Sequence, residues 1–190
     1  AYADAPGTPA TKRSLKLLKL QTSAPAPSDP AKRTELTEIL ASLGAMYGEG
    51  KVCPSGPASC RNLDQLSETL ATSRDYATLE QAWVGWHDTA RPMRPKYQRF
   101  VELANEGARE FGFADLGAMW RSGYDMPPDE FAAVVSRLWG QVQPLYNGMQ
   151  CYARGRLAQR YGEDKVPAGK PIPAHLLGNM WAQTWNKVYD

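Results

Sequence analysis

The chain has 190 residues and nearly balanced charge, with 22 Lys and Arg against 20 Asp and Glu and a formal net charge of +2. This length favours one domain, and the charge balance makes nucleic acid an unexpected partner. Hydrophobic residues form 43% of the chain, which suffices for a sizeable core, yet no apolar run is long enough to cross a bilayer. We therefore expect a soluble chain without a membrane span.

Apolar residues recur at three- and four-residue spacing through most of the chain, and the alternating pattern of β-strands is absent. The sequence therefore predicts an all-α fold, with residues 1–11 as a flexible arm and 12–190 as a helical portion. Asp29 and Asp75 are expected to cap the helices that follow them, and Gly112 to end a helix in a left-handed conformation. Helices are predicted at 12–20, 30–47, 62–73, 76–91, 95–111, 115–124 and 128–161.

The longest predicted helix, 128–161, carries a continuous apolar stripe formed by Phe131, Val134, Val135, Leu138, Trp139, Val142, Leu145, Tyr146, Met149, Tyr152 and Leu157. Pro144 lies inside this helix. An internal proline removes one backbone hydrogen bond and clashes with the preceding turn. A kink or a break is therefore expected near Gly140.

Three cysteines are too few for a disulfide-rich scaffold. Cys53 and Cys60 flank a short Pro-Ser-Gly-Pro-Ala-Ser loop, which a disulfide could close in an oxidising compartment. Cys151 would then stay free, and we expect it to be buried on the long helix. No apolar stretch precedes the first charged residues, so no signal peptide is recognised.

The most distinctive stretch is PIPAHLLGNMWAQTW, residues 171–185. After its prolines, Leu177, Met180, Trp181 and Trp185 follow helical spacing, and a helix is predicted here. Neutral polar side chains beside two indoles would suit a peptide-sized pocket, but an aromatic stripe with this spacing also suits a plain hydrophobic core. The residues alone leave both interpretations open.

Five further segments are distinctive, namely GKVCPSGPASC, ATSRDY, AWVGWHD, FVELANEGAREFGFADLGAMWRSGYD and LYNGMQCYARGRLAQRYG. Together with the C-terminal stretch, and in this order, they resemble the angiotensin-converting enzyme family of zinc peptidyl-dipeptidases, in a bacterial-type member. The resemblance implies a mostly helical, two-lobed enzyme with a deep central cleft that releases C-terminal dipeptides from oligopeptides. It also implies a Cys53–Cys60 disulfide, a periplasmic or secreted location and a monomer.

In that family a His-Glu-x-x-His helix and a downstream Glu bind zinc, and neither occurs in this sequence. The two histidines, His87 and His175, lack the i, i+4 spacing that places two imidazoles on one helical face. The chain therefore resembles an internal portion of the enzyme. Its zinc ligands and catalytic residues are expected elsewhere, and the chain is expected to be inactive by itself. His175 is interpreted as a structural histidine.

The resemblance assigns substrate contacts to the C-terminal stretch. Gln183 matches a glutamine that hydrogen-bonds the terminal carboxylate of the substrate. Thr184 and Trp181 match neighbours that line the pocket for the last side chain. Asp64 matches a carboxylate at the edge of that pocket, although a solvated carboxylate at a helix start is an equal alternative.

Two positions concern chloride, which members of the family bind. Tyr124 matches a tyrosine of the second chloride site, with an ordinary core phenol as the alternative. His87 stands where members with two chlorides have Arg, and a neutral imidazole lacks the permanent charge of Arg, so we expect only the second chloride. A different interpretation of the whole chain is a non-catalytic helical module that binds peptides or a protein partner in an aromatic groove.

Overall fold

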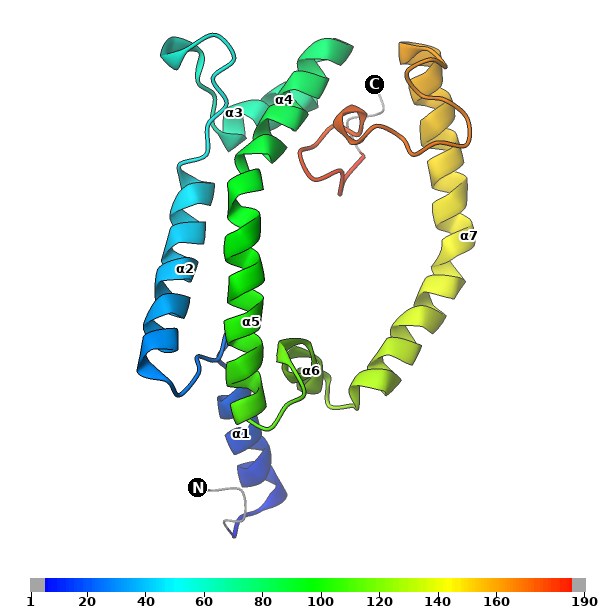
Figure 1. Ribbon diagram of the computed structural model, residues 1–190. Helices are drawn as coiled ribbons and strands as arrows, with labels where there is room; N and C mark the ends of the chain where they lie inside the picture. Colours follow the sequence, from blue (N-terminus) through cyan, green and yellow to red (C-terminus); the bar gives the residue numbers. More distant parts are fainter. Residues whose placement is uncertain (1–5, 186–190) are drawn as a thin grey trace. The chain divides into compact units, whose positions relative to one another are not determined.

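The computed structural model describes residues 6–185, and within this range the chain is helical and contains no strand of a sheet (Figure 1). The predicted all-α fold is confirmed. The chain divides into two compact units, unit 1 with residues 1–41 and 95–139 and unit 2 with residues 42–94 and 140–190. The α-helices of the described range are α1 (Pro9–Leu20), α2 (Pro30–Gly48), α3 (Leu63–Thr72), α4 (Tyr76–Thr89), α5 (Arg94–Glu110), α6 (Leu116–Arg121) and α7 (Pro128–Tyr161).

Local hydrogen bonds explain where several helices begin and end. Asp29 Oδ1 accepts from two backbone N–H groups in the first turn of α2, at 2.8 and 3.0 Å, and Asp75 Oδ1 accepts from Thr78 N at 2.8 Å in α4. Gly112 follows α5 with a φ of +84°, in the left-handed region. All three predicted end residues are confirmed. By contrast, α1 begins at Pro9, earlier than predicted.

In unit 1, α2 and α5 are joined by a paired ionic contact. Two guanidinium nitrogens of Arg99 donate to the two carboxylate oxygens of Glu35, at 2.7 and 2.8 Å. This bond lowers the pKa of Glu35 below its ordinary value. A small core lies nearby along α5, formed by Ala104, Ala108, Leu116 and Met119 with Leu20, Phe100, Phe111 and Phe113 packed against it.

Unit 2 is built around one apolar core to which α3, α4, the last turns of α7 and the C-terminal residues contribute. Its buried members are Leu66, Leu70, Leu79, Ala82, Trp86, Leu157, Val166, Leu176, Leu177 and Met180. In Figure 1 the C-terminal residues, coloured orange to red, lie between α4 and the last turns of α7. Burial of the apolar side chains in this core therefore fixes the C-terminal residues against α4.

The loop between α2 and α3 is closed by the Cys53–Cys60 disulfide, which confirms the predicted pairing. Beside the disulfide, Val52 and Arg61 exchange two backbone hydrogen bonds of 2.9 Å each. Val52 also packs closely on α4, because a Cβ atom added at Gly85 would lie 2.7 Å from the Val52 side chain. The disulfide thus closes a loop that is itself docked on α4.

The helix α7 corrects two predictions. It runs without a break from Pro128 to Tyr161 although Pro144 lies inside it, so the break expected near Gly140 does not occur, while the alternative, a kink there, stays a prediction. A proline removes only one hydrogen bond, and the bonds on either side continue the helix. Cys151 is free, as predicted, but it is exposed and not buried. It lies about 200° around the helix from the buried Ala153, and so faces away from the core.

Apolar side chains in the middle of α7 are largely exposed. Leu145 is 70% exposed, Tyr152 55% and Val142 52%. Among the described residues of α7, only Ala153 and Leu157 are buried. No helix within residues 6–185 has the combined length and apolar content that a membrane span requires.

Candidate functional site

The C-terminal segment, defined here as Asn179–Trp185, carries the predicted substrate contacts Trp181, Gln183 and Thr184. It is not the predicted helix. After a 3₁₀ turn at Ala174–Leu176 the chain continues through turns in which Gly178 and Ala182 have φ angles of +81° and +52°. Both angles lie in the left-handed region, which right-handed helices exclude. The turn preference of Gly and Asn at 178 and 179 therefore overrides the helical spacing of the apolar residues.

Asn179 organises this segment with a single side chain. Its Oδ1 accepts from Trp181 N at 2.8 Å and, over a longer distance of 3.4 Å, from Gln183 N. Its Nδ2 donates to Thr184 Oγ1 at 2.5 Å. The Asn179 carbonyl oxygen also accepts from Ala182 N at 3.2 Å, which closes a turn. All three predicted contact residues are thus bonded to Asn179.

The helix α4 supports the same segment through two aromatic side chains. Trp83 Nε1 donates to the carbonyl oxygen of Met180 at 3.1 Å. His87 stacks on Trp83, with ring centroids 3.8 Å apart, and its Nδ1 lies 2.8 Å from Trp83 O. The edge of the His87 ring contacts Trp181, with centroids 5.9 Å apart. Trp181 itself is 45% exposed, so this member of the aromatic cluster is accessible to solvent.

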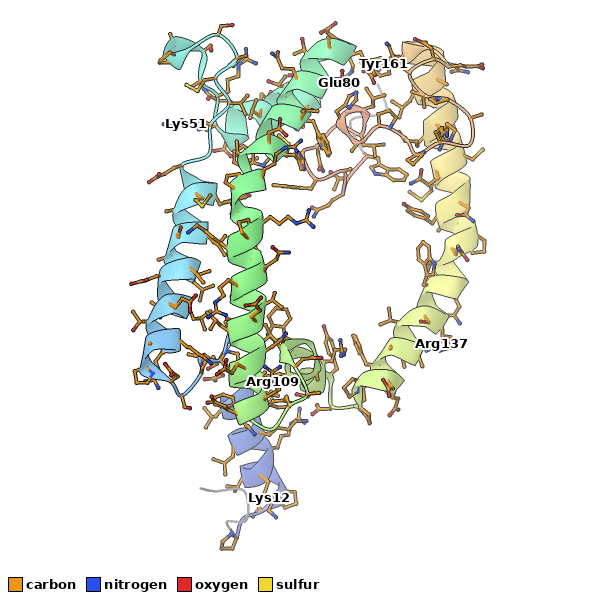
Figure 2. The ribbon with its side chains drawn as sticks, viewed as in Figure 1. Lys12, Lys51, Glu80, Arg109, Arg137 and Tyr161 are labelled. Atoms are coloured by element: carbon orange, nitrogen blue, oxygen red, sulfur yellow. A yellow bond between two sulfur atoms is a disulfide. The ribbon has the colours of Figure 1, made fainter. Side chains whose placement is uncertain are left out.

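Across the segment, α7 supplies a second aromatic contact. The Tyr146 ring lies 6.0 Å from the Trp185 ring, centroid to centroid, and Trp185 Nε1 donates to Ala182 O at 3.0 Å. Figure 2 shows the side chains of α4 and of the C-terminal half of α7 converging on this segment, close to the last turn of α7 that contains Tyr161. Two helices of unit 2 therefore hold the segment from opposite sides.

The segment presents an amide and a hydroxyl group beside exposed aromatic rings. Gln183 and Thr184 are both exposed. The amide of Gln183 can donate two hydrogen bonds. The hydroxyl of Thr184 accepts from Asn179, so its own proton remains available for donation. Neutral donors next to an indole can bind an acceptor group such as a carboxylate at the end of an apolar or peptide-like ligand.

His175 lies inside the core of unit 2, which supports its interpretation as a structural histidine. It is 6% exposed, and its ring contacts the Tyr76 ring edge-on, with centroids 4.7 Å apart. Its Nε2 is buried without a hydrogen-bond partner. Burial lowers the pKa of His175 below its ordinary value of 6.5, because the charged imidazolium would lose its hydration, and the Glu80 charge opposes this shift in part.

The other two predicted site residues lie outside the C-terminal segment. Asp64 is exposed in the first turn of α3, in a shallow hollow whose lining residues all belong to 61–69. Tyr124 belongs to unit 1, is 60% exposed and stacks on Phe131 with centroids 4.2 Å apart. It is therefore not a phenol buried in the core. Its proposed role at an anion site stays a prediction.

A catalytic zinc site does not fit the described residues. Within residues 6–185, no group of three or more His, Cys, Asp or Glu side chains is arranged to hold a metal ion. The two histidines are engaged in different contacts, His87 on Trp83 and His175 on Tyr76. A catalytic zinc needs three protein ligands, and this part of the chain does not supply them.

Sequence reasoning overlooked two residues of the site and underestimated a third. Trp83 and His87 were not assigned to it, although their i, i+4 spacing on one helix predicts a stacked pair. Asn179 is one of the neutral polar side chains beside the two indoles of the C-terminal stretch, and no separate role was predicted for it. Its position directly after Gly178 was the available signal, because Gly-Asn favours a turn in which the Asn side chain bonds the following backbone.

Comparison with known proteins gives a consistent family assignment. A family model described as "Angiotensin-converting enzyme" matches residues 3–190. Angiotensin-converting enzyme of Sus scrofa is 44% identical over 185 residues, which is 95% of this chain. The protein of the same name from Oryctolagus cuniculus is 45% identical over 174 residues, or 90% of this chain, and that from Theromyzon tessulatum 37% over 159 residues, or 81%.

The matched region is a small share of each relative. The chain spans 14% of the length of the Sus scrofa protein, 13% of the Oryctolagus cuniculus protein and 26% of the Theromyzon tessulatum protein. The matches over this region show the family of the chain, because the family model and the alignment with the Sus scrofa protein each cover most of it.

Proposed function

The chain belongs to the angiotensin-converting enzyme family, and on this premise we propose that it forms part of a zinc-dependent peptidyl-dipeptidase that releases C-terminal dipeptides from oligopeptides. The observation that carries the proposal is the C-terminal segment. There Gln183 and Thr184 are exposed and held beside the partly exposed Trp181 by bonds to Asn179. These groups suit the carboxylate end of a peptide and its last side chain.

Each of these residues has a distinct proposed role. The Gln183 amide donates to the terminal carboxylate of the substrate, because an amide can approach a carboxylate without adding charge. Thr184 and Trp181 contact the last side chain of the substrate. Asp64 lies at the edge of the pocket for that last side chain. Tyr124 contributes to one chloride site. In this part of the enzyme the task is to bind and orient the peptide.

We propose that the residues that hydrolyse the peptide bond lie outside this chain. Because the described residues do not fit a zinc site, we place the zinc ligands and the catalytic base outside this chain, and we expect the chain alone to be inactive. The Cys53–Cys60 disulfide supports a periplasmic or secreted location, since such bonds persist in oxidising compartments. We propose a monomer for the protein that contains it.

The proposal is tested on the protein that contains this chain, with the variant Gln183→Ala. Removing an amide that donates to a carboxylate should weaken binding of a free-acid peptide by about 1.5 to 3 kcal/mol. The same peptide with an amidated C-terminus should bind both forms equally. Gln98→Ala, at an exposed glutamine of α5, serves as the matched control and should bind both peptides like the unmodified protein. An equal loss for both peptides in Gln183→Ala would remove Gln183 from the carboxylate site.

A second candidate function is a non-catalytic module that binds peptides in an aromatic groove. The exposed face of the Trp83, His87 and Trp181 cluster favours it, because such a surface binds apolar side chains without any catalytic group. Assays of zinc content and dipeptide release, made on this chain and on a longer protein of the same gene, discriminate the two. Zinc-dependent release by the longer protein alone supports the peptidase, and its absence from both supports the module.

A further inference from the structure

We propose that Asn179 is a positioning residue that sets Gln183 in the orientation needed to bind the terminal carboxylate of a peptide, and sets Thr184 beside it. The Thr184 methyl group then contacts the last side chain of the peptide, while its hydroxyl reaches the same carboxylate. The inference rests on the proposed function and assigns a role to a residue for which the sequence suggested none. In this proposal Asn179 does not touch the ligand. It acts through the two side chains that do.

Three hydrogen bonds connect the Asn179 side chain to Trp181, Gln183 and Thr184. Asn179 Oδ1 accepts from Trp181 N and Gln183 N, at 2.8 and 3.4 Å, and Asn179 Nδ2 donates to Thr184 Oγ1. Three of the four hydrogen-bonding positions of one amide are thus used within its own turn. No regular helix or sheet holds this segment, so these bonds replace the backbone ladder that would otherwise fix its conformation.

Asn179 also bonds the backbone of a turn with an unfavourable conformation. Ala182 has a φ of +52°, a conformation that costs a residue with a Cβ atom about 1 to 2 kcal/mol. Ala182 immediately precedes Gln183, and its N–H donates to Asn179 O at 3.2 Å. The Asn179 bonds therefore hold the chain in an unfavourable turn that determines where Gln183 emerges.

Asn179 also sets the direction of the Thr184 hydroxyl. Asn179 Nδ2 is a donor only, so Thr184 Oγ1 must accept from it. The hydroxyl proton of Thr184 is then free to point at a ligand, and Thr184 is exposed. A donor hydroxyl next to a donor amide suits an acceptor group with two oxygens, which is what a carboxylate offers.

Anchoring of the segment is separate from this role. Met180 is 2% exposed, and its carbonyl is bonded by Trp83 Nε1 at 3.1 Å, so the segment stays attached to α4 through residues other than Asn179. Loss of the Asn179 side chain should therefore loosen the turn from Trp181 to Thr184 without detaching it from the core.

The first test uses this chain and does not depend on peptidase activity. Backbone amide exchange of Trp181 and Gln183 should be faster in Asn179→Ala, because both N–H groups lose their acceptor. In Asn179→Asp it should stay near that of the unmodified chain, because a carboxylate oxygen accepts the same bonds. Unchanged exchange in Asn179→Ala would overturn the inference.

The second test measures peptide binding by the protein that contains the chain. Asn179→Ala should weaken the free-acid peptide about tenfold, the effect of losing about one hydrogen bond to a charged group, and leave the amidated peptide unchanged. Asn179→Asp should keep the turn and still bind the free acid about tenfold more weakly than the unmodified protein, because its carboxylate accepts the Thr184 proton and repels the carboxylate of the peptide. A merely structural role predicts an equal loss for both peptides and would overturn the inference.

The outcomes for the two proposals can be told apart. If Gln183→Ala loses selectivity for the free acid and Asn179→Ala keeps it, the positioning role is wrong and the proposed function stands. If neither variant changes selectivity, the carboxylate site itself is wrong, and the role of Asn179 in it falls as well. Thr184→Val, which keeps the shape of the side chain without its hydroxyl, provides a second variant that should fold and should weaken only the free acid.

Discussion

Trp83 and Met180 are 97 residues apart in the sequence, and a hydrogen bond of 3.1 Å joins the indole Nε1 of one to the backbone carbonyl of the other. This bond fastens the C-terminal segment to α4. Because Met180 is 2% exposed, no bulk water can replace the indole if it is lost.

The variant Trp83→Phe tests that bond. It should lower the free energy of unfolding by about 1 to 3 kcal/mol, because a buried carbonyl loses its donor. Trp120→Phe is the matched control, since Trp120 Nε1 donates to Ser23 O at 2.8 Å but its ring is 54% exposed, so water can take over the bond. Urea unfolding followed by circular dichroism measures both. Equal losses in the two variants would contradict the argument from burial.

The unfolding free energy should depend on pH through His175. Burial lowers the pKa of this imidazole in the folded chain, so the unfolded chain binds a proton more readily. Its contribution to stability is complete above pH 6.5, the ordinary pKa, and is lost as the pH falls below that value. The Tyr76 ring contacts the imidazole, the Glu80 charge favours protonation, and Lys165 Nζ lies 5.1 Å from the centroid of the Tyr76 ring.

Urea unfolding measures the free energy of unfolding at about pH 7.5 and about pH 5, above and below the ordinary pKa of histidine in model peptides. The value at the lower pH should be smaller. His175→Leu should reduce the difference between the two pH values, because leucine does not titrate. Leu176→Ala, at a buried residue of the same core that does not titrate, is the control and should leave the difference in place. An unchanged difference in His175→Leu would exclude His175 as the source.

The disulfide should stabilise the folded chain by restricting the unfolded one. Replacing both Cys53 and Cys60 by serine should lower the free energy of unfolding by about 2 to 3 kcal/mol, the value that loop-closure entropy gives for so short a loop. Cys151→Ser should change it by less than about 0.5 kcal/mol, because Cys151 is exposed. A thiol reagent should also label one thiol per native chain, and none in Cys151→Ser. Labelling of two or three thiols would argue against the bridge.

Two helical glycines should respond to alanine in opposite ways. In Gly107→Ala the new Cβ atom would lie 2.1 Å from the Pro25 carbonyl oxygen, so the backbone must shift, and a loss of about 2 kcal/mol or more is expected. In Gly44→Ala no atom lies within 4 Å of the new Cβ, and alanine favours the helix by about 1 kcal/mol. Thermal unfolding of the two variants measures the contrast. A stable Gly107→Ala variant would contradict the close packing of α5 on Pro25.

Local signals in the sequence determined where the helices begin. Asp29 and Asp75 cap helices because a side-chain oxygen bonds the backbone two or three residues ahead, and this needs no distant partner. The same holds for Gly112, since the left-handed conformation after α5 depends only on the absence of a Cβ atom. The Cys53–Cys60 pairing was likewise suggested by a short loop and by the resemblance.

Tertiary structure decided the burial and conformation of residues that contact distant parts of the chain. A free cysteine on the long helix was expected to be buried, as free cysteines usually are. Burial depends on which side of α7 meets a core, and Ala153 and Leu157 occupy that side. The C-terminal segment satisfied a helical pattern too. It adopts turns instead, which Asn179 forms through local bonds that the Gly178-Asn179 pair already signalled. Where these turns lie depends on the bond from Trp83 to Met180, 97 residues away, which fixes them on α4. Contacts over such separations depend on how the helices pack, which no pattern of neighbouring residues encodes.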